Sequence, residues 1–376
     1  MATMARTGKA AVFRGPGQPF ELRELPLPEL EPGAVLVRVT LANICGSDLH
    51  FWRGDAPLAL PPDGWIFGHE MTGHVAALGA GVRSDSLGQP LREGDRVAYC
   101  YFYPCGRCYV CLQGQRAACP AKIGRATGPG EFPHWVGAFA EYYYLRPGGF
   151  VFRVPDDLPD ALVSPVNCAL SQVLFGLSRA GLALGESVVI QGAGGLGLQA
   201  VAVARDMGAG TVIVIDQLAE RLELARAFGA DHTLHLAEVP DRRARVKQVR
   251  DWTGGRGADL ACDFVGFPPV VPEGVEMLRA GGRYLEIGCI SRGRTVEFDP
   301  SSLVWGSKTI IGVVMYDPWV IPRALEFLRR GRGRYPFDRL VSHTYPLDRI
   351  DEAFRDAEWY QREAAPSRIT RAALAP

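Results

Sequence analysis

The stretch Ser187-Val-Val-Ile-Gln-Gly-Ala-Gly-Gly-Leu-Gly197 decides the fold of the second half of this chain. It begins as a buried strand, and residues 198–207, which follow the glycines, have the pattern of a helix. Gly192 permits a tight turn, Gly194 lets the backbone approach a pyrophosphate, and Gly197 lets helix and strand pack closely. A strand, a glycine turn and a helix in this order predict a Rossmann unit, in which the helix N-terminus offers N–H groups to the phosphates of a dinucleotide.

A carboxylate about twenty residues beyond these glycines indicates which dinucleotide binds. The next strand, Thr211-Val-Ile-Val-Ile215, ends in Asp216, which is predicted to bind the ribose hydroxyls of NAD and to repel the 2′-phosphate of NADP. Asp216 could instead be a turn residue that caps the next helix, and Arg221 could lie along the adenosine ribose or on an exposed face. We therefore predict NAD as the cofactor, and expect contacts to it from Gly192, Gly194, Gly195, Leu196, Gly197, Asp216, Arg221 and Val265.

A chain of 376 residues is long enough for about two domains, and its two halves differ in pattern. Before about residue 154, short β-type runs such as Ala34–Thr40 alternate with Gly and Pro turns, which is typical of an antiparallel, barrel-like β domain. From about residue 165 to about residue 315, short apolar strands alternate with amphipathic helices, which predicts βαβ units and a doubly wound parallel sheet. We expect an α/β protein with domains at 1–164 and 165–317, and a C-terminal segment, 318–376, that returns to the first domain.

Four cysteines lie within fifteen residues, at Cys105, Cys108, Cys111 and Cys119. Thiolates that recur every third residue, with a fourth slightly further on, let a short loop wrap one tetrahedral Zn²⁺ ion. Four thiolates leave no open coordination position and give a formal net charge of minus two, so we predict a structural ion. A disulfide framework is the alternative, but an intracellular enzyme would keep its thiols reduced.

Composition and charge narrow the class of partner. The formal net charge is zero, and the apolar fraction of 47% is ordinary for a soluble globular protein. The one basic run, Arg242 to Arg250, has helical spacing and is most simply a solvated helix face, so we expect neither nucleic acid nor a membrane as a partner. The run from Met1 to Arg6 lacks the apolar stretch of a signal peptide, and no window reaches the length of a membrane span, so we expect a cytoplasmic protein.

Two further segments of the first domain carry possible metal ligands. Cys45-Gly-Ser-Asp-Leu-His50 and Gly68-His-Glu-Met-Thr-Gly73 fall in its loops, although Cys45 alone could be a small buried hydrophobe and His69 a satisfied core imidazole. Together with the glycine motif and the four cysteines, they resemble the zinc-dependent alcohol dehydrogenases of the medium-chain dehydrogenase/reductase superfamily. The resemblance spans almost the whole chain, and residues 68–79 are among its more specific signatures. It implies that the first domain is a GroES-like β-barrel with a structural zinc lobe.

The resemblance also implies a second, catalytic zinc ion. Cys45, His69 and Cys168 match its ligands, and Glu70 matches a carboxylate that can approach the metal when water or substrate exchanges. Two thiolates and a neutral imidazole cancel the charge of Zn²⁺ and leave one position free for water or an alcohol. Asp48 is expected to hold the ring of His69. Polyol dehydrogenases of the superfamily commonly carry a glutamate in place of Cys168, so the cysteine favours an alcohol dehydrogenase.

A proton relay and a substrate pocket follow from the same resemblance. Ser47 and His50 match a relay in which a hydroxyl beside the metal passes a proton to a histidine open to solvent, although they could be a turn serine and a surface histidine. Gln172 stands where many relatives carry a threonine near the nicotinamide, which leaves that hydroxyl contact in doubt. Aromatic walls suit a bulky apolar alcohol, and four residues could form them or could equally be core: Phe51, Trp52, Tyr101 and Trp135.

The sequence therefore predicts an NAD-dependent enzyme with two zinc ions per chain that interconverts a bulky alcohol and its ketone or aldehyde, and we expect the alcohol to be secondary. A reductase of a conjugated C=C or C=N bond could use the same scaffold with a lost relay, and a non-catalytic NAD-binding protein would be expected to lose zinc ligands. The intact relay and ligand sets disfavour both. We expect a small alcohol or ketone as partner and a homodimer or homotetramer. Of the nine cysteines, Cys100, Cys262 and Cys289 are expected to be buried packing residues.

Overall fold

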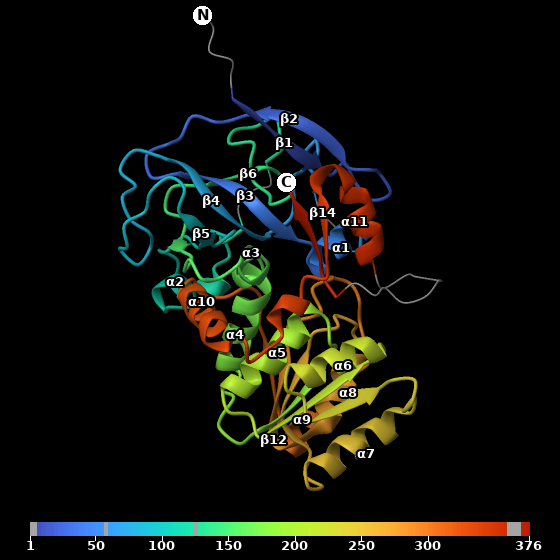
Figure 1. Ribbon diagram of the computed structural model, residues 1–376. Helices are drawn as coiled ribbons and strands as arrows, with labels where there is room; N and C mark the ends of the chain where they lie inside the picture. The colour runs from blue at the N-terminus through green and yellow to red at the C-terminus, as the bar shows by residue number, and fades with distance from the viewer. Residues whose placement is uncertain (1–5, 56–58, 124–126, 359–369) are drawn as a thin grey trace, which may run out of the picture. The chain divides into compact units, whose positions relative to one another are not determined.

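The structure is a computed structural model, and it describes residues 6–55, 59–123, 127–358 and 370–376 (Figure 1). Residues 1–5, which belong to the N-terminal run used to predict the location, lie outside the described residues. Residues 359–369 of the predicted C-terminal segment also lie outside them.

The chain forms two compact units. The first contains residues 1–168, 317–331 and 337–376, and the second contains residues 169–316 and 332–336. The segment that begins at residue 317 therefore returns to the first unit, apart from a short stretch that belongs to the second. The first unit extends to Cys168 rather than ending at residue 164, so this predicted zinc ligand belongs to the same unit as Cys45 and His69.

A mostly antiparallel sheet of seven strands forms the centre of the first unit. Its order is β14 (His343–Pro346), β15 (Ala372–Ala375), β3 (Val35–Asn43), β4 (Glu70–Leu78), β5 (Arg96–Tyr99) and β7 (Val151–Arg153), and β6 (Tyr142–Leu145) pairs with β3. A separate two-stranded sheet contains β1 (Thr7–Val12) and β2 (Glu21–Pro26). The predicted antiparallel β domain is confirmed, with one parallel pair, β14 and β15, supplied by the C-terminal segment.

Two irregularities bend this sheet. The register between β3 and β4 shifts between Leu36 and Val37 and again between Val39 and Leu41. An extra residue in one strand of a pair increases the local twist and bends the strand, which lets a sheet curl towards a barrel. Buried apolar side chains fill the inside, and the fully buried Phe139 packs edge-on against Phe354 of the C-terminal segment.

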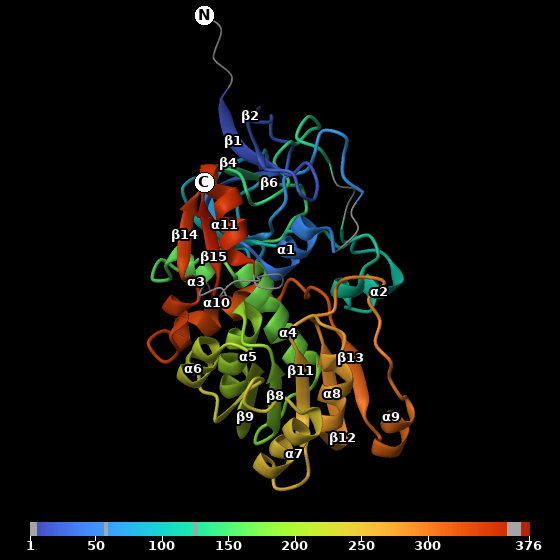
Figure 2. The ribbon, with the colours of Figure 1, turned by 90° about the vertical axis from the view of Figure 1, so that its right-hand side faces the viewer.

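The helices of the first unit are short and mostly occupy the connections between strands. They are α1 (Gly46–Arg53), α2 (Tyr109–Leu112), η1 (Arg116–Ala118), α3 (Asp160–Val163), α10 (Val320–Gly331), η3 (Phe337–Arg339), η4 (Leu347–Arg349) and α11 (Ile350–Ala357). The π-helical turn η2 (Val166–Leu170) lies where the first unit ends. In Figures 1 and 2, α11 lies beside β14, which agrees with its place in the same C-terminal segment.

A parallel sheet of six strands forms the centre of the second unit (Figure 2). Its order is β10 (His232–His235), β9 (Thr211–Asp216), β8 (Ser187–Gln191), β11 (Ala258–Asp263), β12 (Leu278–Glu286) and β13 (Thr309–Gly312). All five residues of β8 are buried, as expected for a central strand covered on both faces. The predicted doubly wound parallel sheet is confirmed.

The strand order of the second unit reverses between β8 and β11. Its helices are α4 (Ser171–Arg179), α5 (Gly195–Asp206), α6 (Ala219–Ala227), α7 (Arg242–Trp252), α8 (Val270–Met277) and α9 (Ser301–Gly306). In an open parallel sheet, ligands bind beyond the carboxyl ends of the strands at the point where the order reverses. The glycine motif follows β8 and Val265 follows β11, so both lie at this switch point.

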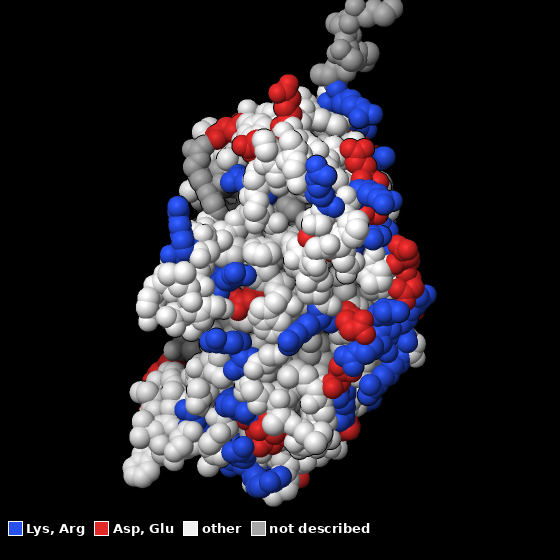
Figure 3. Space-filling view, turned by 90° about the vertical axis from the view of Figure 1, so that its left-hand side faces the viewer, with Lys and Arg blue, Asp and Glu red and all other residues white. Residues whose placement is uncertain are grey.

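The basic run on α7 is largely paired with acidic side chains. Arg245 forms a two-pronged ion pair with Glu273, and Arg242 does the same with Glu276, both on α8. Basic and acidic side chains are also interspersed on another face, the one that lies on the left in Figure 1 (Figure 3). The ion pairs therefore hold α7 against α8, and the carboxylates of α8 offset part of the positive charge of the run.

Among the described residues, one helical stretch, Asp160–Arg179, is long and apolar enough to cross a membrane by length and composition alone. Its length is 20 residues, and 83% of its most apolar window is buried inside the structure. The expectation that no window reaches the length of a membrane span is therefore wrong. Core helices of this kind pass the same test, so the stretch is weak evidence for a membrane span.

Candidate active site

The first unit brings three predicted metal ligands together. Asn43, the last residue of β3, pairs with Glu70, the first residue of β4, so the residues just beyond β3 and just before β4 lie at the same edge of the sheet. This pairing places Cys45 near His69. The third ligand, Cys168, lies on η2. The ligand atoms of these three residues lie within 4.8 Å of one another.

Hydrogen bonds fix the turn that carries Cys168. The side-chain oxygen of Asn167 accepts from the backbone N–H of Met71 at 3.2 Å, which fastens η2 to the start of β4. The side-chain amide of Asn43 also donates to Ser164 at 3.0 Å. Cys45 and Cys168 are buried, and the side chain of His69 is 16% exposed. The cluster is thus part of the folded core of the first unit.

The chemistry of this donor set fits a zinc ion. A hydrogen bond from Cys168 lowers the pKa of Cys45 well below its usual value, and the same bond raises the pKa of Cys168. Burial alone would lower the pKa of His69, but the charges of Asp48 and Cys45 outweigh burial and raise that pKa to about 10. A divalent cation would displace the protons of Cys168 and His69 and would then be bound by two thiolates and one neutral imidazole nitrogen.

Two neighbours orient the imidazole of His69. Asp48 is 1% exposed; its Oδ1 lies 3.3 Å from Nδ1 of His69, and its Oδ2 accepts from the backbone N–H of Cys45 at 2.9 Å. Nε2 of His69 is thereby left for the metal position. The hydroxyl of Ser47 lies 3.3 Å from the same Nε2. The short turn from Cys45 to Asp48 thus supplies a ligand, a hydroxyl beside the metal position and a carboxylate behind it.

Glu70 has a partner that sequence reasoning missed. The fully buried Glu70 forms an ion pair with Arg371, which is 5% exposed and immediately precedes β15. Burial lowers the pKa of Arg371, and the negative charges of Cys45 and Asp48 oppose that shift. Because β15 pairs with β3 next to Asn43, the C-terminal segment delivers a positive charge to the catalytic cluster. The sequence signal was weak, since one arginine before a short apolar run has many ordinary explanations.

The aromatic residues predicted to form a pocket take different places. The ring of Tyr101 lies 4.9 Å from that of His69, and its hydroxyl lies 4.0 Å from Sγ of Cys168. Trp52 packs against Phe354 at 5.8 Å, and Phe51 lies 6.2 Å from Trp65.

Trp135 takes the core position that the sequence left open. Its side chain is 0% exposed, and its indole N–H donates to the backbone carbonyl of Pro26 at 2.9 Å. It packs in a buried cluster with Ala10, Leu36 and Tyr144. Tyr101 is therefore the predicted pocket residue that the structure brings to the metal ligands.

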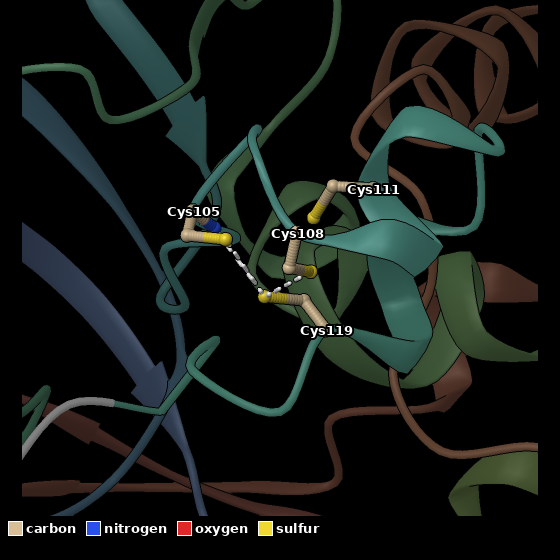
Figure 4. Close-up of side chains that lie close together, drawn as sticks. All are labelled: Cys105, Cys108, Cys111 and Cys119. Carbon is tan, nitrogen blue, oxygen red and sulfur yellow. Dashed lines mark hydrogen bonds between the residues drawn. The ribbon is translucent and has the colours of Figure 1, made fainter.

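Four sulfur atoms converge in the lobe that carries α2 (Figure 4). The Sγ atom of Cys119 lies 3.7 Å from that of Cys105 and 3.8 Å from that of Cys108, and all four sulfurs lie within 4.8 Å of one another. None of the four forms a disulfide. Hydrogen bonds from the backbone N–H groups of Arg107 and Cys108 lower the pKa of Cys105 to about 6, which favours a thiolate. This geometry suits one ion held by four sulfur ligands.

The glycine motif has the backbone conformation that the fingerprint requires. Gly192 adopts a φ of +95°, which favours glycine, and Cγ2 of Val265 lies close to it. Gly194 precedes α5, and a Cβ there would meet nothing within 4 Å, so the space beside this glycine is open. A Cβ on Gly197 would overlap the carbonyl oxygen of Gly192, so helix and strand approach closely. Gly195 and Leu196 form the first turn of α5.

Asp216 lies at the end of β9 and already accepts two hydrogen bonds. Its Oδ2 accepts from the backbone N–H of Ala193 at 2.7 Å, and its Oδ1 accepts from Leu218 at 2.9 Å. The residue therefore organises the turn before α6 as well as the glycine loop, and each oxygen keeps a further lone pair for a ribose hydroxyl. Arg221 lies on α6; burial lowers its pKa, while the charge of Asp216 opposes that shift.

Four further residues lie outside the two clusters of predicted zinc ligands. Gln172, whose role the sequence left in doubt, lies half-buried on α4. Cys100 and Cys262 are buried, as expected, but Cys289 is only partly buried, and its Sγ lies 3.6 Å from Oδ2 of Asp263. The expectation that Cys289 is a buried packing residue is therefore wrong. Cys289 lies in the segment that follows β12 rather than within a strand of the sheet.

Models of two known protein families match large parts of the chain. Residues 31–156 match the model of the alcohol dehydrogenase GroES-like domain, and residues 195–330 match that of the zinc-binding dehydrogenases. A relative from Pseudomonas putida, 5-exo-hydroxycamphor dehydrogenase, is 35% identical over 335 residues, which cover 89% of this chain and 91% of that protein.

Two solved structures are also similar. One is an alcohol dehydrogenase from Thermotoga maritima, with a TM-score of 0.89 and 31% identity over 99% of this chain and 100% of that one. The other is a putative zinc-binding dehydrogenase from Sinorhizobium meliloti bound to NADP, with a TM-score of 0.83 and 26% identity over 99% of this chain and 100% of that one.

A GroES-like unit with a thiol and imidazole cluster, followed by a Rossmann unit, defines the class of zinc-binding dehydrogenases. Within that class, this chain belongs to the zinc-dependent alcohol dehydrogenases of the medium-chain dehydrogenase/reductase superfamily. The resemblance predicted from the sequence is confirmed. The chain is an oxidoreductase that acts on alcohols.

Proposed function

We propose that this alcohol dehydrogenase uses NAD and interconverts a bulky secondary alcohol and its ketone. The observation that carries the proposal is the place of Tyr101, beside His69 and Cys168. A flat, rigid ring next to two of the three ligands narrows the space around the metal position and offers apolar area to a substrate. Similarity to a dehydrogenase named for hydroxycamphor supports the same substrate class.

The site residues would divide the chemistry between them. A zinc ion held by Cys45, His69 and Cys168 would act as a Lewis acid and lower the pKa of the alcohol hydroxyl. Asp48 holds the ring of His69, and Ser47, 3.3 Å from Nε2 of that ring, is placed to take the proton of the alcohol.

The proton and the hydride would leave the alcohol in opposite directions. His50 would be the outer proton acceptor, which passes the proton to solvent. The carbon that bears the hydroxyl would lose its hydride to NAD, held by the glycine loop and Asp216. A panel of primary, secondary and cyclic alcohols, read as NADH absorbance after the zinc content has been measured, tests the proposal. Bulky secondary alcohols should be oxidised fastest.

The proposal extends to the wider properties predicted from the sequence. We propose two zinc ions per chain, a cytoplasmic location, and a small alcohol or ketone as partner rather than nucleic acid or membrane. We also propose a homodimer or homotetramer. Support for self-association comes from β13, which is an edge strand of the parallel sheet, and from the adjacent Trp305, which is 90% exposed. An unpaired strand edge with exposed apolar side chains fits contact with a second copy of the chain.

The preference for NAD should depend on the charge of Asp216. We expect the wild-type protein to have a kcat/KM at least about tenfold higher with NAD than with NADP, because the carboxylate binds the ribose diol and repels a phosphate. Asp216→Gly should narrow that ratio. Asp216→Asn also removes the charge and should narrow the ratio, while its one amide oxygen keeps one of the two backbone contacts, to Ala193 or to Leu218. A wild-type protein that prefers NADP would contradict the assignment.

A further inference from the structure

Two carboxyl groups lie side by side at the carboxyl ends of two neighbouring strands of the parallel sheet. Asp263, the last residue of β11, pairs in register with Glu286, the last residue of β12. Successive side chains of a strand alternate between the faces of a sheet, so residues that pair in register lie on the same face. One oxygen of each carboxyl group and Sγ of Cys289 lie within 4.8 Å of one another.

The two carboxyl groups differ in the hydrogen bonds that they accept. Asp263 is 0% exposed; its Oδ1 accepts from the backbone N–H of Val265 at 2.6 Å, and both of its oxygens accept from that of Gly266, at 3.1 and 3.3 Å. Oε1 of Glu286 accepts from the backbone N–H of Cys289 at 2.9 Å. Oε2 of Glu286 is buried and has no hydrogen-bond partner among the described residues. The backbone donors therefore favour a charged carboxylate at Asp263, and nothing comparable stabilises a charge on Oε2 of Glu286.

Two neighbouring carboxyl groups in a buried place favour sharing one proton, because the first negative charge disfavours the second ionisation. Burial, followed by the negative charge of Asp263, raises the pKa of Glu286 to about 8. Burial also raises the pKa of Asp263, but the hydrogen bonds from Val265 and Gly266 oppose that shift. The proton of the pair therefore belongs on Glu286 at neutral pH.

Among the described residues, the elements packed against Glu286 bring no cation to it. Tyr284 and Cys289 are neutral at neutral pH, because burial raises both pKa values. Neither β13 nor α9, which flank β12, has an ionisable side chain. The arginines of β12 lie towards its other end and pair with other acids, and the acids of α8 pair with α7: Arg279 with Asp259, Arg283 with Glu186, Glu273 with Arg245, and Glu276 with Arg242.

Asp263 lies at the base of a loop, residues 264–267, which we call the cofactor loop. This loop contacts the glycine motif and the turn after β12. Cγ2 of Val265 would lie 2.9 Å from a Cβ added to Gly192, and the carbonyl oxygen of Gly288 would lie 2.5 Å from one added to Gly266. Because these segments approach so closely, a shift of the cofactor loop would move Val265 relative to the glycine motif.

We propose that Glu286 is a positioning residue for the cofactor loop: it keeps its proton at neutral pH and donates it from Oε2 to the carboxylate of Asp263. Asp263 in turn holds the cofactor loop through the N–H groups of Val265 and Gly266. Loss of the proton would leave two negative charges at the base of this loop, and their repulsion would displace it. The inference rests on the proposed function, in which the glycine motif binds NAD.

NAD should bind more weakly as the pH rises through about 8, the pKa of Glu286 in the free protein. Bound NAD requires the cofactor loop in place and so favours the protonated pair, which means that binding should raise this pKa. A group whose pKa rises on binding supports binding below its free pKa, and that support is lost as the group ionises. A rise of about one unit would lower the affinity about tenfold at high pH.

Calorimetry of NAD binding to the whole protein, at about pH 7 and about pH 10, tests the proposal. The dissociation constant should rise about tenfold further in the wild type than in Glu286→Gln. Glutamine has the shape of a protonated glutamate, and its amide can donate to Asp263 but cannot ionise. Ionisation elsewhere, including at the zinc ligands, is common to both proteins, so the difference isolates Glu286. An equal rise in both proteins would overturn the proposal.

Two further variants separate the charge from a merely structural effect. Glu297→Gln makes the same substitution at an exposed carboxylate in the segment after β12 and should keep the wild-type rise. Glu286→Leu removes both the charge and the donor, so it should bind NAD less tightly than the wild type at neutral pH and should lack the additional rise. If Glu286→Gln fails to fold, Glu286→Leu decides the outcome, because a full wild-type rise in that variant would exclude the role of Glu286.

Infrared spectroscopy detects the shared proton without cofactor or turnover. The difference spectrum between the two pH values should contain the carbonyl stretch of a protonated carboxyl group, and Glu286→Gln should lack that band. Absence of the band in the wild type would overturn the proposal. A third zinc ion per chain that is lost in Glu286→Gln would also overturn it, because a cation would then take the place of the proton. Preference for NADP together with the band would contradict the proposed cofactor and leave the shared proton in place.

Discussion

Replacing Cys45 with serine is expected to lower kcat/KM for alcohol oxidation by about a thousandfold or more, equivalent to roughly 4 kcal/mol of transition-state stabilisation. Serine keeps the size of the side chain but lacks the thiolate that a zinc ion requires. Cys45 is buried next to Cys168 and His69, so its main partners are the other ligands. The melting temperature should change little, and steady-state kinetics with a thermal melt measures both effects.

Cys108→Ser is the matched control, because it makes the same substitution in the four-cysteine lobe. A zinc ion bound by the four cysteines would stabilise a loop that has little regular structure. Its loss should lower the melting temperature by about 5 °C or more, while folded molecules keep most of their activity. Elemental analysis should find two zinc ions in the wild type and one in each variant. Full activity in Cys45→Ser would contradict the catalytic assignment, and one zinc in the wild type would contradict the two-site assignment.

A substrate with the size of cyclohexanol is expected to have a kcat/KM roughly a hundredfold higher than that of ethanol. The larger alcohol has four more carbons, and each buried CH₂ contributes about 0.8 kcal/mol, so about 3 kcal/mol separates the two if all four are buried. Such a difference corresponds to about two orders of magnitude. Steady-state rates of NADH formation for the two alcohols measure it.

The preference for cyclohexanol over ethanol should depend on the ring of Tyr101, which lies 4.9 Å from the ring of His69. Tyr101→Ala should reduce the ratio between the two alcohols, because it removes an apolar wall beside the metal ligands. Tyr101→Phe keeps the ring and serves as the control, so it should keep the ratio. Ethanol and cyclohexanol turning over equally well in the wild type would exclude a pocket that favours bulky alcohols.

The fold could be predicted from local features of the sequence. The glycine motif works through backbone geometry within six residues, and the four cysteines act within one short lobe, so neither needs knowledge of distant contacts. The alternation of short apolar strands with amphipathic helices predicted the parallel sheet, because this pattern is also local. The three ligands Cys45, His69 and Cys168 were found through family resemblance, since nothing in their separate positions shows that they meet.

The parts that the sequence could not predict depend on long-range pairing. Glu70 pairs with Arg371, and Arg53 pairs with Glu358 as well as with Asp55. The C-terminal segment brings Arg371 and Glu358 back to the first unit. Their side chains look like ordinary surface charges until β15 is known to pair with β3. Trp135 shows the converse, because its position in the chain suggested a pocket and only its burial places it in the core.

The product formed from NADH and a conjugated cyclic enone tests the assignment of alcohol chemistry most directly. Such a substrate offers both a C=O and a C=C bond to the same enzyme, so one measurement separates an alcohol dehydrogenase from a reductase of conjugated double bonds. With the wild-type protein at full zinc content, we expect the unsaturated secondary alcohol, in which the carbonyl is reduced and the double bond is intact. A saturated ketone as the main product would contradict the proposed function.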